Sequence, residues 1–248
     1  KKFLGIQNGF RGPRVDDVSK YIGTLSLSNM LCFGQETIDK YRLAGQKIDN
    51  YTLVGSLVDG LYRQSIKSVP KEEFDVCLIS QYRPSRFEHS MPLLKTITID
   101  MLEFIQKYCE EKEKSFCIAM SCKADNRDAE YEFFSHYIWL DRVSMIENNG
   151  ASFSTYSTID KSHVSVHNYS TAGIEGLGRG NKILFANTTA DHEFSLTPEY
   201  AGGIWSLCRQ GLTYPEFSER MDQIEQMSKA DWLKASSEMS SYFLFQHP

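Results

Sequence analysis

The fold is decided by the stretch HVSVHNYSTAGIEGLGRGNKILFA, which occupies residues 163–186. It begins with alternating valines, continues through small polar residues into a run of helix length, reaches a glycine at position 180 and ends in a second apolar strand. Strand, turn, helix, glycine and strand in this order are typical of a βαβ unit, in which two parallel strands flank a helix. The stretch therefore predicts an α/β protein with a parallel sheet.

The same alternation of short strands and longer amphipathic helices extends along the rest of the chain. Gly45 and Gly180 stand where helices should stop, because glycine accepts the left-handed conformation that follows a helix. We predict strands near residues 3–7, 29–33, 51–54, 74–80, 116–120, 163–167 and 182–186. We predict helices near residues 35–44, 93–111, 127–137, 170–179, 214–226 and 230–239.

A polar segment that contains Pro70 separates two blocks of these elements. The block before it has only three strands and looks like the tail of a larger lobe, whereas the block after it carries a fuller series. We therefore predict two Rossmann-like lobes. Residues 1–57 form the C-terminal part of an incomplete N-terminal lobe, residues 58–73 an interlobe linker, and residues 74–248 a second lobe with C-terminal helices. Because the sequence begins without Met, we expect further residues before Lys1.

Composition excludes several classes of protein. The 27 Lys and Arg residues against 32 Asp and Glu residues give a formal charge of −5, so no global basic field exists to hold a nucleic acid. No apolar run reaches the roughly 18 residues that a membrane-spanning helix needs. The six cysteines lack CxxC or zinc spacing, which favours reduced, buried thiols in a cytoplasmic protein.

The turn between the strand and the helix at residues 167–175 is a candidate anion site. Ser170 or Thr171 is expected at the N-cap, where its side-chain oxygen would accept a hydrogen bond from a backbone N–H. The remaining N–H groups and the helix dipole favour a phosphate there, and the small Gly173 lets a ligand approach the backbone. Glu175 follows one turn later, where its carboxylate could accept hydrogen bonds from two ribose hydroxyls. The alternative is an ordinary cap followed by an acidic residue that complements the dipole.

Two further residues at the end of this strand, His167 and Asn168, are expected to contact the same ligand. The glycines that follow do not form GxGxxG in the dinucleotide register, so an NAD site is disfavoured. His163 and His167 share one face of the strand, but no third ligand accompanies them, and no DxD carboxylate pair occurs in a suitable loop. We therefore predict no metal.

The pattern of Ser-Thr, Gly-x-Glu-Gly-Leu-Gly-Arg-Gly and a buried strand over residues 170–185 resembles the donor-binding half of GT-B glycosyltransferases. Weaker matches occur earlier in the chain, at residues 3–9, 51–56 and 74–81, and they stand in the order expected of that fold. The similarity is closest to bacterial surface-carbohydrate proteins of O-antigen and capsule biosynthesis, and more distant to Kdo transferases and CDP-glycerol glycerophosphotransferases. It implies that the C-terminal lobe binds the donor and the N-terminal lobe faces the acceptor.

Other strand ends supply further candidates for donor binding, because ligands of open α/β sheets lie at the carboxyl ends of the strands. The strand at residues 74–80 is followed by Gln81, Arg83 and Arg86. We expect the two guanidinium groups to face the cleft, where they could neutralise a departing phosphate. Lys123 follows the next strand and is placed to contact the base or a phosphate. The alternative for each is a solvated loop side chain.

Acceptor and catalytic groups are expected in the turn after the first strand, at residues 8–17. Asn8 stands where the similar proteins have His, so the base is another residue or the mechanism differs. Asp16 or its neighbour Asp17 could act as a base on the acceptor hydroxyl, or could simply start the following helix. Together with Arg83, Asn8 and Asp16 are the catalytic candidates.

The resemblance implies a metal-independent glycosyltransferase that moves a sugar from a nucleotide-activated donor to a bacterial surface polysaccharide or lipopolysaccharide. The donor is a substrate, so no cofactor is expected. A CMP-linked acidic sugar such as Kdo is favoured, and UDP and CDP donors remain open. The expected partners are this donor and a glycan or lipid-linked glycan acceptor, with no nucleic acid. We expect a cytoplasmic protein that could associate peripherally with the inner face of the membrane.

Two alternatives belong to other classes. A CDP-polyol phosphotransferase would use the same scaffold to transfer a phosphate-linked unit. A noncatalytic sugar-nucleotide-binding module would retain the donor site without the chemistry.

Overall fold

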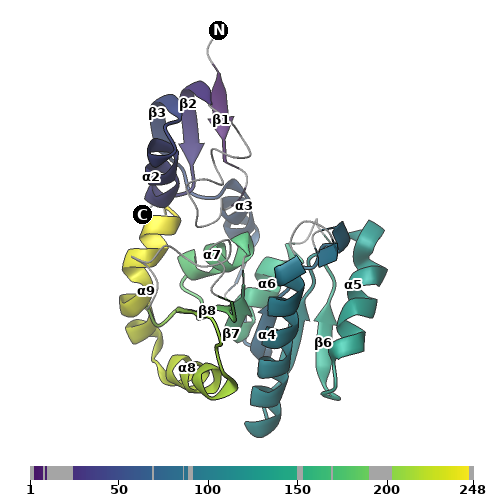
Figure 1. The fold of residues 1–248 in the computed structure, drawn as a ribbon. Helices are drawn as coiled ribbons and strands as arrows, with labels where there is room; N and C mark the ends of the chain where they lie inside the picture. Colours follow the sequence, from purple (N-terminus) through teal and green to yellow (C-terminus); the bar gives the residue numbers. More distant parts are fainter. Residues whose placement is uncertain are drawn as a thin grey trace.

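Two parallel β-sheets covered by helices form the protein (Figure 1). The computed structural model describes residues 3–7, 9, 25–68, 70–85, 87–88, 92–149, 153–168, 170–189 and 203–245. A three-stranded sheet comes from residues 4–53 and a six-stranded sheet from residues 74–208. The predicted α/β class with two parallel sheets is confirmed.

The three-stranded sheet consists of β1 (Leu4–Ile6), β2 (Ser26–Cys32) and β3 (Lys47–Leu53) in this order. Helix α2 (Gln35–Leu43) connects β2 to β3, and Gly45 follows it with the left-handed φ of +68° that the sequence predicts. Strands β2 and β3 begin earlier than predicted, because their parallel pairing extends into polar residues. A small apolar core holds α2 on the sheet; its buried members are Met30, Cys32, Ile38 and Tyr41.

The six-stranded sheet has the order β6-β5-β4-β7-β8-β9. The chain moves outward from β4 to β6, returns to place β7 beside β4, and then continues outward to β9. A crevice opens where the direction of winding reverses, outside the carboxyl ends of β4 and β7. The strands are β4 (Phe74–Ile79), β5 (Phe116–Ala119), β6 (Val143–Ile146), β7 (Ser162–His167), β8 (Ile183–Asn187) and β9 (Ser206–Cys208). The sequence did not predict β6 and β9, which have only 4 and 3 residues.

Five of the helices around this sheet were predicted, with small differences at their ends. They are α4 (Pro92–Glu111), α5 (Ala124–Tyr137), α7 (Thr171–Gly178), α8 (Tyr214–Gln226) and α9 (Lys229–Phe243). The short helix α6 (Ser154–Asp160) was not predicted. Gly180 follows α7 with a left-handed φ of +83°. Among the described residues, none of the helices combines the length and the apolar composition that a bilayer span requires.

Helix α3 (Leu57–Ser65) lies in the segment that the sequence predicts to be a linker. Its burial pattern is the reverse of an ordinary surface helix: Asp59 and Tyr62 are buried, whereas Leu57 and Leu61 are exposed. The apolar residues of α3, Leu57, Val58 and Leu61, are exposed, and Leu57 and Val58 line a cavity described below. The connection between the two sheets is thus partly helical, and α3 packs through its polar residues.

The C-terminal helix α9 returns to the N-terminal sheet (Figure 1). At its end, the Tyr242 hydroxyl donates to Asp39 in α2 over 3.0 Å, and the Phe245 N–H donates to the Phe33 carbonyl over 2.7 Å. Gly34 allows this close approach, because a Cβ there would collide with the backbone of Tyr242 and Phe243. These contacts tie the two sheets together a second time, independently of α3.

Candidate functional site

A cavity of about 460 Å³ lies where the winding of the large sheet reverses. Both sheets contribute to its walls, together with the start of α3, helix α6 and the first turn of α7. Its position outside the carboxyl ends of β4 and β7 is the one that open α/β sheets use for ligands. The described lining residues are Ile6, Gln7, Phe33, Ser56, Leu57, Val58, Ile79, Ser80, Gln81, Arg83, Ser121, Asn148, Thr155, Tyr156, Ser170, Thr171, Ala172 and Glu175.

The turn from β7 into α7 is held by His167 rather than by a serine cap. Ser170 occupies the predicted N-cap position, but its side chain makes no capping hydrogen bond, and this part of the prediction is wrong. Instead the Ser170 N–H donates to His167 Nδ1 over 3.0 Å. Burial lowers the pKa of His167 to about 3, so the ring is neutral and can accept this bond. The side chains of Ser170 and Thr171 are left to line the cavity.

Gly173 makes room for this histidine. A Cβ at position 173 would lie 2.5 Å from His167 Cδ2, inside the imidazole ring's contact distance. The sequence predicts that this glycine admits a ligand to the backbone, but its free side is filled by His167. The small residue is explained by packing within the turn.

We expect Gly173→Ala to lower the free energy of unfolding by about 1–3 kcal/mol, because the ring is fully buried and must move. Urea denaturation measures the loss. Gly60→Ala is the matched control in α3, since a Cβ there meets nothing within 4 Å, and alanine should stabilise that helix by up to about 1 kcal/mol. Equal effects of the two substitutions would contradict the role given to His167.

Glu175 lies one turn into α7 and is only 1% exposed. Both its carboxylate oxygens are engaged: the Ser56 hydroxyl donates to Oε1, and the Tyr156 hydroxyl donates to Oε2 over 2.6 Å. Burial raises the pKa of Glu175 to about 7, although these two hydrogen bonds act in the opposite direction. Ser56 caps α3 and Tyr156 belongs to α6, so Glu175 joins three elements at the floor of the cavity.

A second buried contact joins α3 to α7 one turn further on. The Arg179 guanidinium pairs with Asp59 of α3 at 2.5 Å and with Asp160 of α6 at 2.9 Å. Its carbon also lies 5.1 Å from the ring centroids of both Tyr62 and Tyr156. Burial alone would lower the pKa of Arg179, but the neighbouring carboxylates of Asp59 and Asp160 raise it by more. The pKa of Arg179 therefore lies above its ordinary value. No local pattern in the sequence predicts this group, because its members are far apart in the chain.

Arg83 approaches the cavity from the loop after β4. Its Nη1 donates to the Ser121 hydroxyl over 2.5 Å and to the Tyr82 carbonyl over 2.7 Å. Among the described lining residues it is the sole Lys or Arg. Gln81 lies beside it on the same wall, and its amide donates to the Ser80 carbonyl over 3.2 Å. The guanidinium is therefore held at the cavity by the loops that follow β4 and β5.

The structure brings five of the predicted site residues to the cavity: the donor-binding candidates Gln81, Ser170, Thr171 and Glu175, and the catalytic candidate Arg83. Four others are not among its lining residues. His167 and Gly173 pack inside the β7–α7 turn, buried Asn168 donates to Thr98 over 3.2 Å, and exposed Lys123 stands at the N-cap of α5.

Three predicted residues, Asn8, Asp16 and Arg86, lie outside the described residues. The turn that contains Asn8 is described only at Gly9. A Cβ on Gly9 would lie 3.6 Å from the Thr171 hydroxyl, so at that point the turn faces the first residue of α7. Gln7 precedes it, lines the cavity and donates to the Gly9 carbonyl over 2.9 Å.

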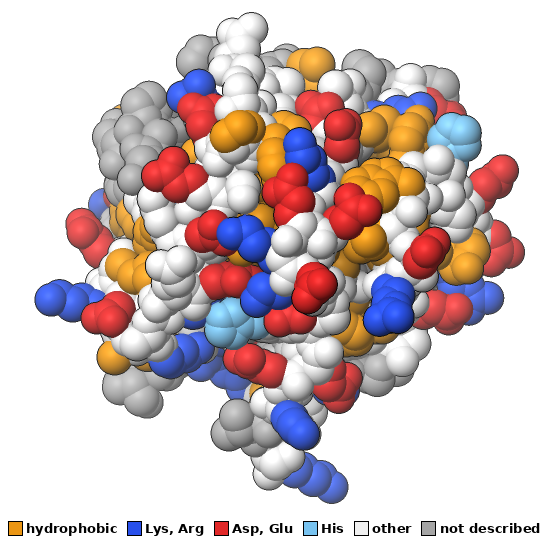
Figure 2. All heavy atoms as spheres, turned by 90° about the horizontal axis from the view of Figure 1, so that it is seen from below, with side chains coloured by type: hydrophobic (Ala, Val, Ile, Leu, Met, Phe, Trp, Pro, Cys, Tyr) orange, Lys and Arg blue, Asp and Glu red, His pale blue; other side chains and the backbone are white. Residues whose placement is uncertain are grey.

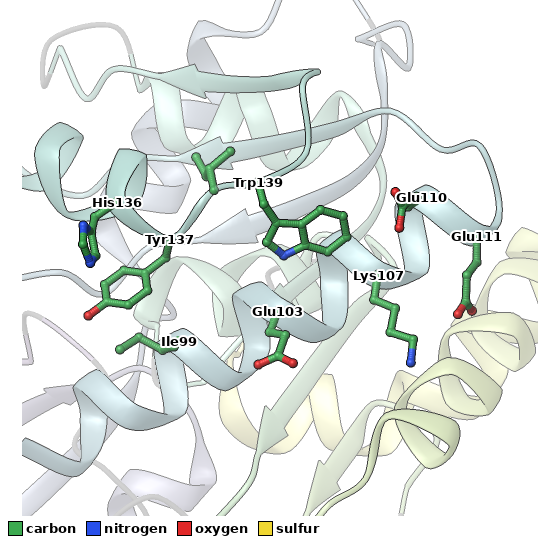
Figure 3. A pocket seen from close by; sticks show the side chains of 9 residues that line it. Ile99, Glu103, Lys107, Glu110, Glu111, His136, Tyr137 and Trp139 are labelled. Carbon is green, nitrogen blue, oxygen red and sulfur yellow. The ribbon is translucent and has the colours of Figure 1, made fainter.

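A different hollow, of about 600 Å³, lies between α4 and the end of α5. Figure 3 shows the Trp139 indole above the α4 side chains of Glu103 and Lys107, with Glu110 to its right. None of the predicted site residues that the structure describes lines it. Figure 2 shows acidic and basic side chains interspersed on the face that it views, without a broad patch of one sign. Within the described ranges, no three His, Cys, Asp or Glu residues gather as metal ligands.

Several solved structures have a similar fold. UDP-GlcNAc 2-epimerase of Methanocaldococcus jannaschii, in complex with UDP-GlcNAc and UDP, is 11% identical with a TM-score of 0.57, over 91% of this chain and 70% of that chain. The Neisseria meningitidis enzyme bound to UDP-GlcNAc is 16% identical with a TM-score of 0.54, over 96% and 68%. Anabaena HepE with UDP is 12% identical with a TM-score of 0.51, over 98% and 68%. The predicted GT-B type fold is confirmed.

A comparison of the sequence with family models identifies the family. No curated protein matches the chain significantly. Residues 4–247, however, match the model of a family described as "putative O-antigen biosynthesis protein". This match spans nearly all of the sequence, including both sheets and every described residue of the cavity wall. The chain therefore belongs to this family of O-antigen biosynthesis proteins.

Proposed function

We propose that the protein is a glycosyltransferase that binds a nucleotide-activated sugar in the 460 Å³ cavity and transfers the sugar to a bacterial surface glycan. The observation that carries the proposal is the meeting of three features in one crevice: the first turn of α7, the buried carboxylate of Glu175 and the guanidinium of Arg83. The family of O-antigen biosynthesis proteins supports a role in surface-glycan assembly.

The donor phosphate would lie at the first turn of α7. The first N–H groups of a helix have no partner within the helix, and Ser170, Thr171 and Ala172 all line the cavity there. An anion gains these donors and the positive end of the helix dipole. Arg83 on the facing wall would stabilise the negative charge that develops on the departing phosphate. The helix and the guanidinium together supply the electrostatic stabilisation that phosphate departure requires.

Glu175 would bind the ribose by accepting a hydrogen bond from a ribose hydroxyl in place of one from the protein. Its oxygens already accept hydrogen bonds from Ser56 and Tyr156, so a ribose hydroxyl would have to share or replace one of them. All three side chains line the cavity, which supports such an exchange at its floor. Ribose binding would then compete with the contact between α3 and α7.

The proposal also extends to the nucleotide base and to the acceptor. Resemblance favours a CMP-linked acidic sugar, whereas the similar structures named above hold UDP or UDP-GlcNAc. The acceptor would be a glycan or lipid-linked glycan. Isothermal titration with CMP, CDP, UDP and their sugars should give saturable binding for one base, and binding of none would refute the donor site.

Arg83→Ala should weaken binding of that nucleotide by roughly 10- to 100-fold. A hydrogen bond to a charged group contributes about 1.5–3 kcal/mol, and about 1.4 kcal/mol is a factor of ten. Arg142→Ala, which removes an exposed arginine before β6 at the opposite end of the sheet, is the control and should leave the dissociation constant unchanged. Equal affinities of the wild type and Arg83→Ala would remove Arg83 from the site.

A sugar-nucleotide epimerase is the second candidate, because two of the similar structures are UDP-GlcNAc 2-epimerases. The two activities differ in their products. A transferase releases the nucleotide only when an acceptor glycan is present, whereas an epimerase converts the nucleotide sugar without an acceptor. Product analysis of the bound nucleotide sugar, with and without surface-glycan acceptor, decides between them.

A further inference from the structure

A fully buried carboxylate lies beneath the loops that carry Arg83. Glu130, in the middle of α5, is 0% exposed. It accepts hydrogen bonds from the Ser121 N–H over 2.9 Å, from the Cys122 N–H over 2.6 Å and from the Ser80 hydroxyl. The Ser121 hydroxyl lies 3.2 Å from the same carboxylate. In the described part of the chain, no Lys, Arg or His forms an ion pair with Glu130.

The placement of these donors distinguishes Glu130 from an ordinary core residue. A buried carboxylate is costly unless hydrogen bonds satisfy it, so its partners indicate what it holds in place. Ser80 follows the end of β4, and Ser121 and Cys122 follow the end of β5. Glu130 therefore fixes the loops at the carboxyl ends of two adjacent strands, and Ser80 and Ser121 both line the cavity.

Two short chains of hydrogen bonds lead from Glu130 to the segment that carries Arg83. Along the first, Glu130 orients Ser121, whose hydroxyl accepts a hydrogen bond from Arg83 Nη1 over 2.5 Å. Along the second, Glu130 binds the Ser80 hydroxyl, and the Ser80 oxygen accepts from the Tyr82 N–H over 3.1 Å. Glu130 thus controls both the partner of the guanidinium and the backbone that precedes it.

We infer that Glu130 is a positioning residue that holds the Arg83 guanidinium in the orientation needed to bind the donor phosphate. The inference rests on the proposed function, because it gives Arg83 a ligand. Glu130 itself does not reach the ligand, since it is enclosed by the loops that it binds. Fixing a charged side chain before the ligand arrives lowers the entropic cost of binding.

Glu130→Gln tests the inference because it keeps the shape of the side chain but replaces one acceptor oxygen with an N–H donor. That donor would face a backbone N–H or a hydroxyl that now donates to Glu130. We expect nucleotide affinity to fall by roughly 5- to 20-fold, less than in Arg83→Ala. In the Arg83→Ala background, Glu130→Gln should cause no further loss, because the two residues act as one unit. Glu132→Gln, an exposed change on the same helix, should have no effect.

A second readout does not depend on nucleotide binding. The Arg83 Nε–H signal in a ¹⁵N spectrum, identified by its disappearance in Arg83→Ala, should report an ordered side chain in the wild type and a mobile one in Glu130→Gln. An ordered Arg83 in Glu130→Gln, or additive losses of affinity in the double variant, would overturn the inference. Absence of nucleotide binding in the wild type would refute the proposed function instead, and the mobility of Arg83 would still decide the role of Glu130.

Discussion

Arg179→Ala is expected to lower the free energy of unfolding by about 3–5 kcal/mol, because removing one partner of a buried ion pair leaves the other charge uncompensated. Asp160 would lose its cation, Asp59 would keep only Arg63, whose side chain is 40% exposed, and both carboxylates are themselves at most 10% exposed. The aromatic rings of Tyr62 and Tyr156 would also lose the guanidinium that lies beside them. The loss should detach α3 from α7 as well as destabilise the chain.

Urea denaturation measures this effect, and hydrogen exchange of the α3 amides reports the detachment. Arg127→Ala is the matched control, because Arg127 pairs with Glu147 on the surface, where both side chains are largely exposed. Such pairs contribute about 0–1 kcal/mol. Similar losses in the two variants, or unchanged exchange in α3, would contradict a buried connection between α3 and α7 at Arg179.

Glu175→Gln is expected to change how stability depends on pH. Burial raises the pKa of Glu175 from its ordinary value of 4.5 to about 7 in the folded protein, so the folded state holds a proton that the unfolded state has released. The stability that this proton contributes is fully present below about pH 4.5 and is lost as the pH rises through about 7. Relative to Glu175→Gln, the wild type should lose about 1.4 kcal/mol per pH unit within this window, or roughly 3 kcal/mol in total.

Chemical denaturation at several pH values between 4 and 8 measures the difference between wild type and Glu175→Gln. The glutamine amide imitates the neutral carboxyl, since it can still accept from one hydroxyl and donate to the other. Glu132→Gln, which alters an exposed carboxylate on α5, provides a comparison outside the cavity. If the stability of the wild type relative to Glu175→Gln stays constant or rises between pH 4.5 and 7, Glu175 is ionised in the folded protein.

Much of the fold follows from local patterns that the sequence displays. The apolar strands and the helices with an apolar face were predicted with small errors at their ends, because each pattern is set by the burial of one face. Gly45 and Gly180 marked helix ends through their conformational freedom. Strands β6 and β9 were missed because they are short, and the nine-residue α3 was missed because a polar segment with Pro70 directly follows it.

The site was predictable only where its residues are contiguous or stand at the end of a recognisable strand. Ser170 and Glu175 are such residues because they stand in one contiguous segment, and Arg83 is one because it follows β4. All three line the cavity. The partners that orient these residues are far from them in the sequence. Ser56, for example, lies 119 positions from Glu175. Glu130 likewise looks like one more acid on a charged helix until the loops around it are known.

The position of a bound nucleotide tests the proposed donor site most directly. A crystal structure of the protein with the nucleotide that titration identifies should place a phosphate at the first turn of α7, within hydrogen-bond distance of Arg83, and the ribose beside Glu175. A nucleotide bound away from this cavity, or phosphates that touch neither α7 nor Arg83, would contradict the donor site proposed for this protein.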